Sequence, residues 1–199
     1  MTDELSPLGF TVIAVAFDDD AEVVRPWTEG ITFPVLLDRN HVLSETYAIS
    51  NVPTVVWIDE QDRIVRPNGV AHGSDTFKEF TGVESGLHMD LLRSWVRTGE
   101  VPLAAEEARR AVADLSEDEV LARLHFRIAV HARRAGDDDA AHRHFDEAAR
   151  LAPYDWTIRR AALPLTGGDP FGQEFFAMYG EWQAAGSPYH GLPAVRATP

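Results

Sequence analysis

The segment that most constrains the fold is Pro53 to Ile58, which reads Pro-Thr-Val-Val-Trp-Ile. Its β-branched and apolar residues, followed by the polar turn Asp59 to Asp62, predict a buried strand that opens on a proline. A proline is tolerated at the first residue of a strand because it removes little from the hydrogen-bonded ladder. Arg63 to Arg66 is the predicted hairpin partner across this turn.

A second buried strand is predicted from Phe10 to Phe17, which reads Phe-Thr-Val-Ile-Ala-Val-Ala-Phe. The acidic residues that follow can cap a helix that runs to about Glu29. Pro26 lies more than one turn inside this helix, so we expect the helix to be irregular or to start late. His41 to Ala48 predicts another short helix.

The order of these segments resembles the redoxin branch of the thioredoxin superfamily, the ResA- and TlpA-like proteins. The resemblance is carried by the order of the elements and by the segments between them. A strand that ends on an Asp is followed by a helix and by Gly30-Ile-Thr-Phe-Pro-Val-Leu-Leu-Asp38. Tyr47-Ala-Ile and Asn51-Val-Pro-Thr then lead into a strand that ends at Ile58-Asp, and a turn leads to Arg63-Ile-Val.

This resemblance implies an α/β fold over residues 1–99, with a thioredoxin-like sheet and flanking helices. It also implies that the Val52–Pro53 peptide bond is cis, although only about one X-Pro bond in twenty is cis in folded proteins. Val52, Pro53 and Thr54 would then line a substrate groove, where the backbone pairs with a bound protein or peptide.

The chain contains no cysteine. Thioredoxin-like enzymes act through a thiolate of lowered pKa, so this chain cannot perform thiol–disulfide chemistry or form disulfides. The resemblance places the family's cysteine motif and the strand before it ahead of Met1, since Met1 to Leu8 is similar to the later turns of the motif helix. In some redoxin-like proteins carboxylates occupy the cysteine positions.

The strand ahead of Met1 would lie between Phe10–Phe17 and Thr54–Ile58 in a thioredoxin-like sheet. Unpaired buried backbone groups cost about 1 to 3 kcal/mol each, so a gap cannot remain empty. We therefore expect the two strands to pair directly or to accept a strand from the tail after Gly186, from upstream residues or from a second copy. Pairing with a second copy would make the chain a homodimer.

From Ala104 the pattern predicts helices only. The predicted helices cover Ala104–Leu115, Ser116–Ala135, Ala140–Leu151 and Asp155–Leu163. Ser116 and Glu119 form a capping box at the start of the second of these helices. The turn at Gly136 and the spacing of Ala141, Phe145, Ala148 and Pro153 resemble a tetratricopeptide repeat. We expect residues 104–163 to form a tetratricopeptide-like region that packs on residues 1–99, and residues 164–199 to add an aromatic helix and a tail of low order.

Three polar residues lie in and after a glycine-rich loop, where sites are often built: His72, Asp75 and His88. A histidine near a carboxylate could act in acid–base catalysis or bind a metal. The alternative is an ordinary capped loop, with Ser74 or Asp75 capping a short helix and His88 on the surface.

No metal or cofactor is expected. Histidines are frequent in the helical region, at positions 125, 131, 142 and 144, but they follow no ligand spacing and favour solvated helix faces. The acidic runs at 18–20 and 137–139 lack the glycine and distal glutamate of a calcium loop, so helix capping explains them better.

The formal net charge of −14 argues against binding to nucleic acids and to anionic membranes. No apolar run approaches the ~18 residues of a membrane span, and the first residues do not resemble a signal peptide. As given, the chain is expected to be soluble and cytoplasmic.

Three functions remain open. The chain could be a redox-inactive binding or scaffold module that uses the cis-proline groove and the helical region. It could be a carboxylate-bearing redoxin variant or a non-redox enzyme whose active residues precede Met1. It could also be a truncated thiol–disulfide oxidoreductase.

Overall fold

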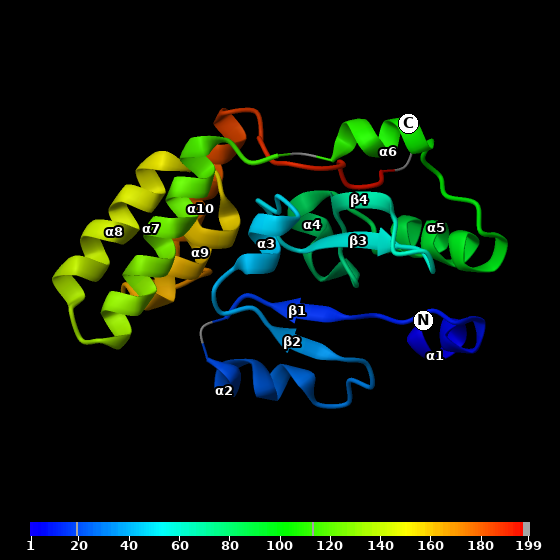
Figure 1. Cartoon of the computed structure of the whole chain (residues 1–199), viewed down its shortest axis with the longest axis horizontal. Helices are drawn as coiled ribbons and strands as arrows, with labels where there is room; N and C mark the ends of the chain where they lie inside the picture. Colours follow the sequence, from blue (N-terminus) through cyan, green and yellow to red (C-terminus); the bar gives the residue numbers. More distant parts are fainter. Residues whose placement is uncertain (19, 113, 197–199) are drawn as a thin grey trace.

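The computed structural model describes residues 1–18, 20–112 and 114–196 (Figure 1). The strands are β1 (Ala14–Ala16), β2 (Val35–Leu37), β3 (Thr54–Ile58) and β4 (Ile64–Val70). The helices of the first half are α1 (Thr2–Leu5), η1 (Ser6–Leu8), α2 (Ala21–Val24), η2 (Arg25–Thr28), α3 (Val42–Thr46), η3 (Asp75–Phe77), α4 (Lys78–Thr81) and α5 (Ser85–Thr98). Those of the second half are α6 (Ala105–Ala111), α7 (Glu117–Arg134), α8 (Asp138–Leu151), α9 (Trp156–Leu165) and α10 (Gln173–Ala184).

The fold is mixed α/β with small sheets followed by a helical region, as the sequence predicts. One sheet pairs β1 with β2 in parallel, and the other pairs β3 with β4 in antiparallel. The predicted hairpin around Asp59 is therefore present. The strand predicted over Phe10–Phe17 is shorter than expected, because β2 offers β1 only the three partners Val35, Leu36 and Leu37.

Of the alternatives expected for the gap, direct pairing of the first and third strands is not found, since β1 and β3 belong to separate two-stranded sheets. The tail after Gly186 does join a sheet, but at β4: Leu192 N–H donates to the Asn68 carbonyl at 2.7 Å and its carbonyl accepts from Val70 N–H at 3.3 Å. Gly191 is needed for this approach, because a Cβ there would lie 2.1 Å from the Asn68 carbonyl oxygen. Pairing with a second copy stays a prediction.

The helix after β1 is irregular, as Pro26 predicts. Asp20 caps α2 by accepting from Glu22 N–H at 3.0 Å, and the chain then tightens into the 3₁₀ turn η2 around Pro26. β4 extends past the predicted Arg66 to Val70, and its pairing with β3 is irregular next to Pro67. An irregular register accommodates a proline that cannot donate to the ladder.

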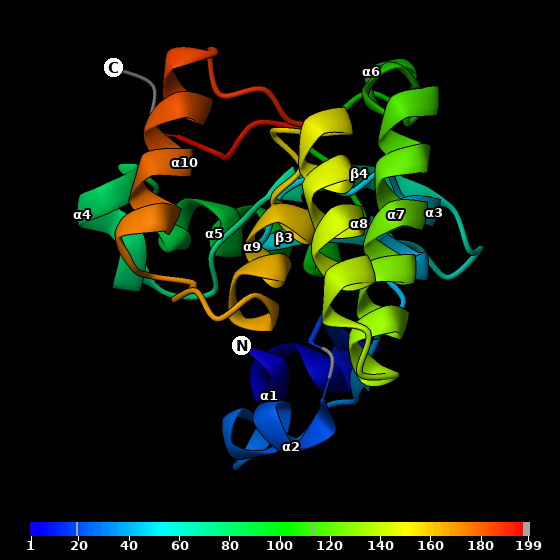
Figure 2. The ribbon, with the colours of Figure 1, turned by 90° about the vertical axis from the view of Figure 1, so that its left-hand side faces the viewer.

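The helical half is built on the hairpin of α7 and α8, with α9 packed on both (Figure 2). Its core combines Phe126, Phe145 and Ile158 with alanines that let the helices approach closely. The capping box of Ser116 and Glu119 is present at the start of α7. The first predicted helix is shorter than expected, and as α6 it lies against β4 (Figure 1).

The aromatic helix α10 packs through Phe175, Tyr179 and Trp182 against Trp156 at the start of α9. A ring cluster of this kind contributes through both buried area and edge-to-face geometry. Among the described residues, every helix is too short or too polar to cross a bilayer.

Candidate functional site

The turn before β3 has the cis peptide bond that the sequence predicts, between Val52 and Pro53. Two hydrogen bonds fix the turn to the end of β4: Thr54 Oγ1 donates to the Gly69 carbonyl at 2.9 Å, and the Pro53 carbonyl accepts from Ala71 N–H at 3.3 Å. The ring of Pro53 itself is exposed.

The two polar backbone groups of Val52 differ in their hydrogen bonding. Its N–H donates to the side-chain oxygen of Asn51 at 2.8 Å. Its carbonyl accepts no hydrogen bond from the described part of the chain. An extended segment beside the exposed Pro53 would therefore find a backbone acceptor there, but no free donor.

The polar residues of the glycine-rich loop serve separate roles. Asp75 accepts hydrogen bonds from the backbone N–H and the hydroxyl of Ser85 at 2.8 and 2.7 Å, and these bonds lower the pKa of Asp75. Asp75 therefore binds the first residue of α5, while Ser74 holds the N-cap position of η3. His72 is buried with its ring 6.1 Å from that of Phe77, and burial lowers its pKa.

His88 is not a surface residue, because only 5% of it is exposed. Its ring lies 5.6 Å from that of Trp57, which also stacks on Trp95 at 5.0 Å and lies beneath the guanidinium of Arg66. Burial, and secondarily the charge of Arg66, lowers the pKa of His88 to about 4. The ring is therefore neutral at pH 7 and packs as part of an aromatic layer under α5.

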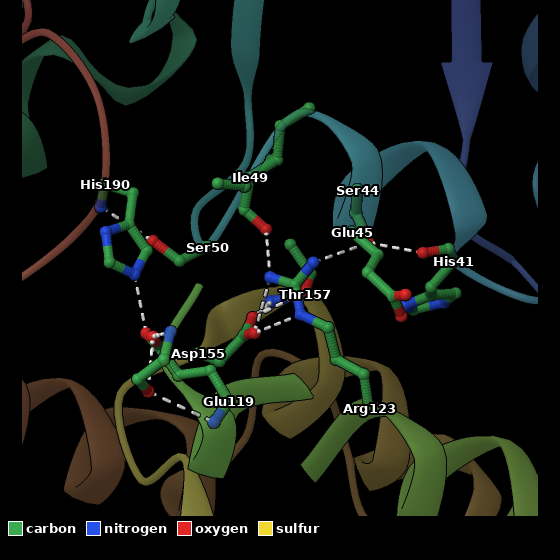
Figure 3. Close-up of polar contacts among 12 residues, drawn as sticks. His41, Ser44, Glu45, Ile49, Ser50, Glu119, Arg123, Asp155, Thr157 and His190 are labelled. Carbon is green, nitrogen blue, oxygen red and sulfur yellow. Dashed lines mark hydrogen bonds and ion pairs between the residues drawn. The ribbon is translucent and has the colours of Figure 1, made fainter. Parts of the chain in front are cut away.

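Arg123 is among the largest fully buried side chains, was not predicted from the sequence, and joins the two halves of the chain (Figure 3). Arg123 of α7 and Asp155 before α9 form an ion pair with donor–acceptor distances of 3.0 and 2.8 Å, and their side chains are 0% and 1% exposed. Arg123 also donates to the Ile49 carbonyl at 2.6 Å and to Ser44 Oγ at 3.4 Å. One side chain thus connects α7, α9 and the segment that leads into β3.

Further contacts attach the same segment to the helical half. Arg127 of α7 donates to the Asn40 carbonyl at 2.6 Å and pairs with Glu45. Trp156 N–H donates to the Ser50 carbonyl at 2.9 Å, two residues before Val52. The helical half therefore holds the chain on both sides of α3 and fixes the approach to the cis-proline turn.

A third connection runs through the tail. His190 donates its backbone N–H to Ser50 Oγ at 2.9 Å, and its Nε2 lies 2.6 Å from Glu119 Oε1 (Figure 3). His41 adds an aromatic contact, with its ring 5.3 Å from that of Phe17 and 4.7 Å from that of Phe126. Burial lowers the pKa of His41.

The candidate residues of the glycine-rich loop contact different partners. His72 lies beside Phe77, Asp75 accepts hydrogen bonds from Ser85, and His88 lies beside Trp57. The chain has no cysteine. Within residues 1–18, 20–112 and 114–196, no three histidine or carboxylate side chains are arranged to hold a metal ion. The cis-proline turn keeps an exposed ring and an open carbonyl on a well-held backbone.

Comparison with known proteins gives one match. The family model described as Redoxin matches residues 1–83, which is 83 of the 199 residues and includes the cis-proline turn. This match supports a thioredoxin-like redoxin domain in that part of the chain. Neither the curated proteins nor the solved structures contain a match.

Proposed function

We propose that this chain is a redox-inactive redoxin-like protein that binds an extended peptide segment of a partner protein at the cis-proline turn. The observation that carries the proposal is the exposed Pro53 beside the open carbonyl of Val52, in a chain without cysteine. A thioredoxin-like surface without a thiol can still bind a peptide, but it cannot exchange a disulfide with it.

The expected binding mode is backbone recognition. The Val52 carbonyl accepts an N–H from the peptide, and the Pro53 ring packs against a neighbouring side chain, as in other cases of strand-like peptide addition. Since the Val52 N–H already donates to Asn51, the peptide gains one backbone hydrogen bond at this residue and not two. The formal net charge of −14 favours basic peptides through electrostatic complementarity.

The helical half supports this mode by holding the turn in place before binding. Ser50 receives hydrogen bonds from Trp156 and His190, and Ile49 receives one from Arg123. A turn that is already ordered loses less conformational entropy when a peptide binds, so more of the contact energy appears as affinity.

The test is a selection from a phage-displayed library of linear peptides, followed by fluorescence polarisation with the enriched peptides. We expect Pro53→Ala to weaken binding by about tenfold, the loss of roughly one packed contact or hydrogen bond. Glu60→Ala is the matched control, because Glu60 is exposed in the β3–β4 turn at the other end of the same strand. Circular dichroism confirms that each variant folds.

A second measurement does not depend on the variant. Carbon-detected NMR should show that the peptide shifts the carbonyl resonance of Val52 and the amide of Thr54. The proposal is wrong if the library yields no peptide above background, or if the bound peptide leaves both resonances unchanged and binds Pro53→Ala as well as wild type.

The lack of redox activity has its own assay. With no thiol in the chain, insulin reduction in the presence of dithiothreitol should proceed at the rate of the buffer control. Turnover above that rate would contradict the redox-inactive assignment while leaving peptide binding to be judged by the titrations.

A further inference from the structure

Two histidines from different helices meet on the helical hairpin. His125 of α7 and His144 of α8 place their Nδ1 atoms 2.7 Å apart, with ring centroids 4.9 Å apart and the rings inclined by 34°. The sequence predicted solvated helix faces for all four histidines of this region, and these two are partly buried against each other. His142, two residues before His144, instead directs its Nδ1 to the Asp138 carbonyl of its own helix.

The backbone beneath this histidine pair is well held. Phe126 and Phe145, each next in sequence to one of the histidines, pack edge to face with centroids 5.8 Å apart. Ala122 and Ala141 are buried in the same core and allow the helices to approach closely. The two histidines are partly buried, and the packing beneath them fixes the separation of their backbones.

The distance between the nitrogens is close to that of a metal chelate. Imidazole nitrogens bind divalent transition metals at about 2.0 to 2.1 Å, so two of them at a right angle lie about 2.9 Å apart, and at a tetrahedral angle about 3.3 Å apart. The observed 2.7 Å needs a change of roughly 0.2 Å for the first geometry and roughly 0.6 Å for the second. Right-angled coordination is typical of Cu²⁺ and Ni²⁺, which also bind nitrogen ligands strongly.

The side chains around the pair are compatible with a cation. Glu147 lies one turn after His144 on the same face of α8, and its carboxylate pairs with Arg150 at 2.6 Å. The chain has no thiolate that would compete for a soft metal. Two imidazoles leave the remaining coordination positions to water.

We propose that His125 and His144 form a binding site for a divalent transition-metal ion with a preference for square-planar nitrogen coordination, Cu²⁺ or Ni²⁺, bound through both Nδ1 atoms. The ion links α7 to α8 and so stabilises the folded hairpin. The site is independent of the cis-proline turn and of any peptide bound there.

The test uses the full chain and isothermal titration with Ni²⁺ and, in a glycine buffer, with Cu²⁺. Wild type should bind one ion per chain, and His125→Gln and His144→Gln should each weaken that binding at least tenfold, because each removes one of two ligands. His142→Gln is the matched control on the same helix and should bind like wild type. Saturating metal should also raise the melting temperature of wild type and of His142→Gln, but not of the other two variants.

Nitrogen NMR of the imidazoles in the presence of diamagnetic Zn²⁺ identifies the liganding atoms, and a shift at Nδ1 of both rings is expected. The proposal is overturned if wild type binds no Ni²⁺ or Cu²⁺ at 100 µM protein, or if His125→Gln and His144→Gln bind as tightly as His142→Gln. Either result would leave the pair as a hydrogen bond between the two rings.

Discussion

The two halves of the chain bury their apolar residues to different degrees. In the helical hairpin, one continuous core joins α7, α8 and α9 through residues such as Phe126, Phe145 and Ile158. In the first half, Ile13 and Leu36 of the β1–β2 layer remain 59% and 52% exposed, and Trp27 beside it is 81% exposed. The hairpin thus has one continuous core of its own, whereas the β1–β2 layer leaves large apolar side chains exposed.

The two halves differ because their contacts join residues at different separations along the sequence. A helical hairpin forms from residues close in sequence, and each helix satisfies its own backbone. A two-stranded sheet with three paired residues leaves both of its outer edges to other elements and is marginal alone. The first half therefore draws stability from the contacts that Arg123, Arg127 and Trp156 make with the segment before β3.

The largest expected effect comes from removing the helical half. A chain that ends at Gly99 loses every contact from α7 and α9 to residues 40–50, so we expect it to lose cooperative unfolding in urea and to bind a hydrophobic dye. A fragment that starts at Ala104 should keep its helical circular dichroism, because its core is local. If the shorter chain stays monomeric and melts at the wild-type temperature, the comparison between the halves is wrong.

A smaller change tests the ion pair at the junction. Arg123→Ala leaves Asp155 buried without its cation and the Ile49 carbonyl without a donor, and breaking a buried pair in this way costs about 3 to 5 kcal/mol. Chemical denaturation measures the loss. Arg109→Ala is the control, because its pair with Glu106 is exposed and exposed pairs contribute about 0 to 1 kcal/mol. Equal effects of the two variants would show that the junction does not stabilise the fold.

Sequence patterns predicted the elements whose cause is local. The β3–β4 hairpin, the irregular helix at Pro26 and the capping box at Ser116 each follow from a few neighbouring residues. The cis bond before Pro53 came from the family resemblance and not from a local pattern, since the X-Pro sequence alone favours trans.

The contacts that the sequence did not predict link residues far apart in the chain. Nothing in the pattern of α7 indicates that Arg123 is fully buried, because its partner Asp155 is 32 residues away and reads as an ordinary helix cap. In the same way, the His125–His144 pair depends on the register of two helices, and the position of His88 depends on how α5 lies on Trp57. How two elements align with each other is set by the packing of the whole structure, so local sequence patterns do not predict it.

The third prediction concerns pH. The pKa of His88 is about 4 in the folded chain and its ordinary value is 6.5, so between these values the unfolded chain binds a proton that the folded chain does not. The stability contributed by a neutral His88 is therefore present above pH 6.5 and is lost as the pH falls toward 4, by about 2 kcal/mol between pH 7 and pH 5. Burial lowers the pKa of His41 and His72 as well, which changes stability in the same direction.

Urea denaturation at pH 7 and pH 5 measures this loss. His88→Gln should reduce the difference between the two pH values, while His142→Gln, on the exposed face of α8, should leave it unchanged. The carboxylates titrate mainly below this range, so they contribute little to the difference. A pH dependence that is the same in all three proteins would contradict the assignment of a buried neutral His88.

The smallest expected effect concerns the tail that connects both halves. His190→Gln removes the contact with Glu119, which is only half-buried, but leaves the backbone bonds of His190 and Leu192 in place. Global stability should fall by only about 0.5 to 1.5 kcal/mol, the usual net value of one hydrogen bond. The local effect should be clearer: hydrogen exchange at Leu192 and Val70 should speed up while exchange in α8 does not change, since the tail can detach without unfolding the hairpin. Faster exchange throughout α8 as well would mean that the tail and the hairpin open as one unit. The stability of the helical half would then depend on the first half, just as the stability of the first half depends on the helical half.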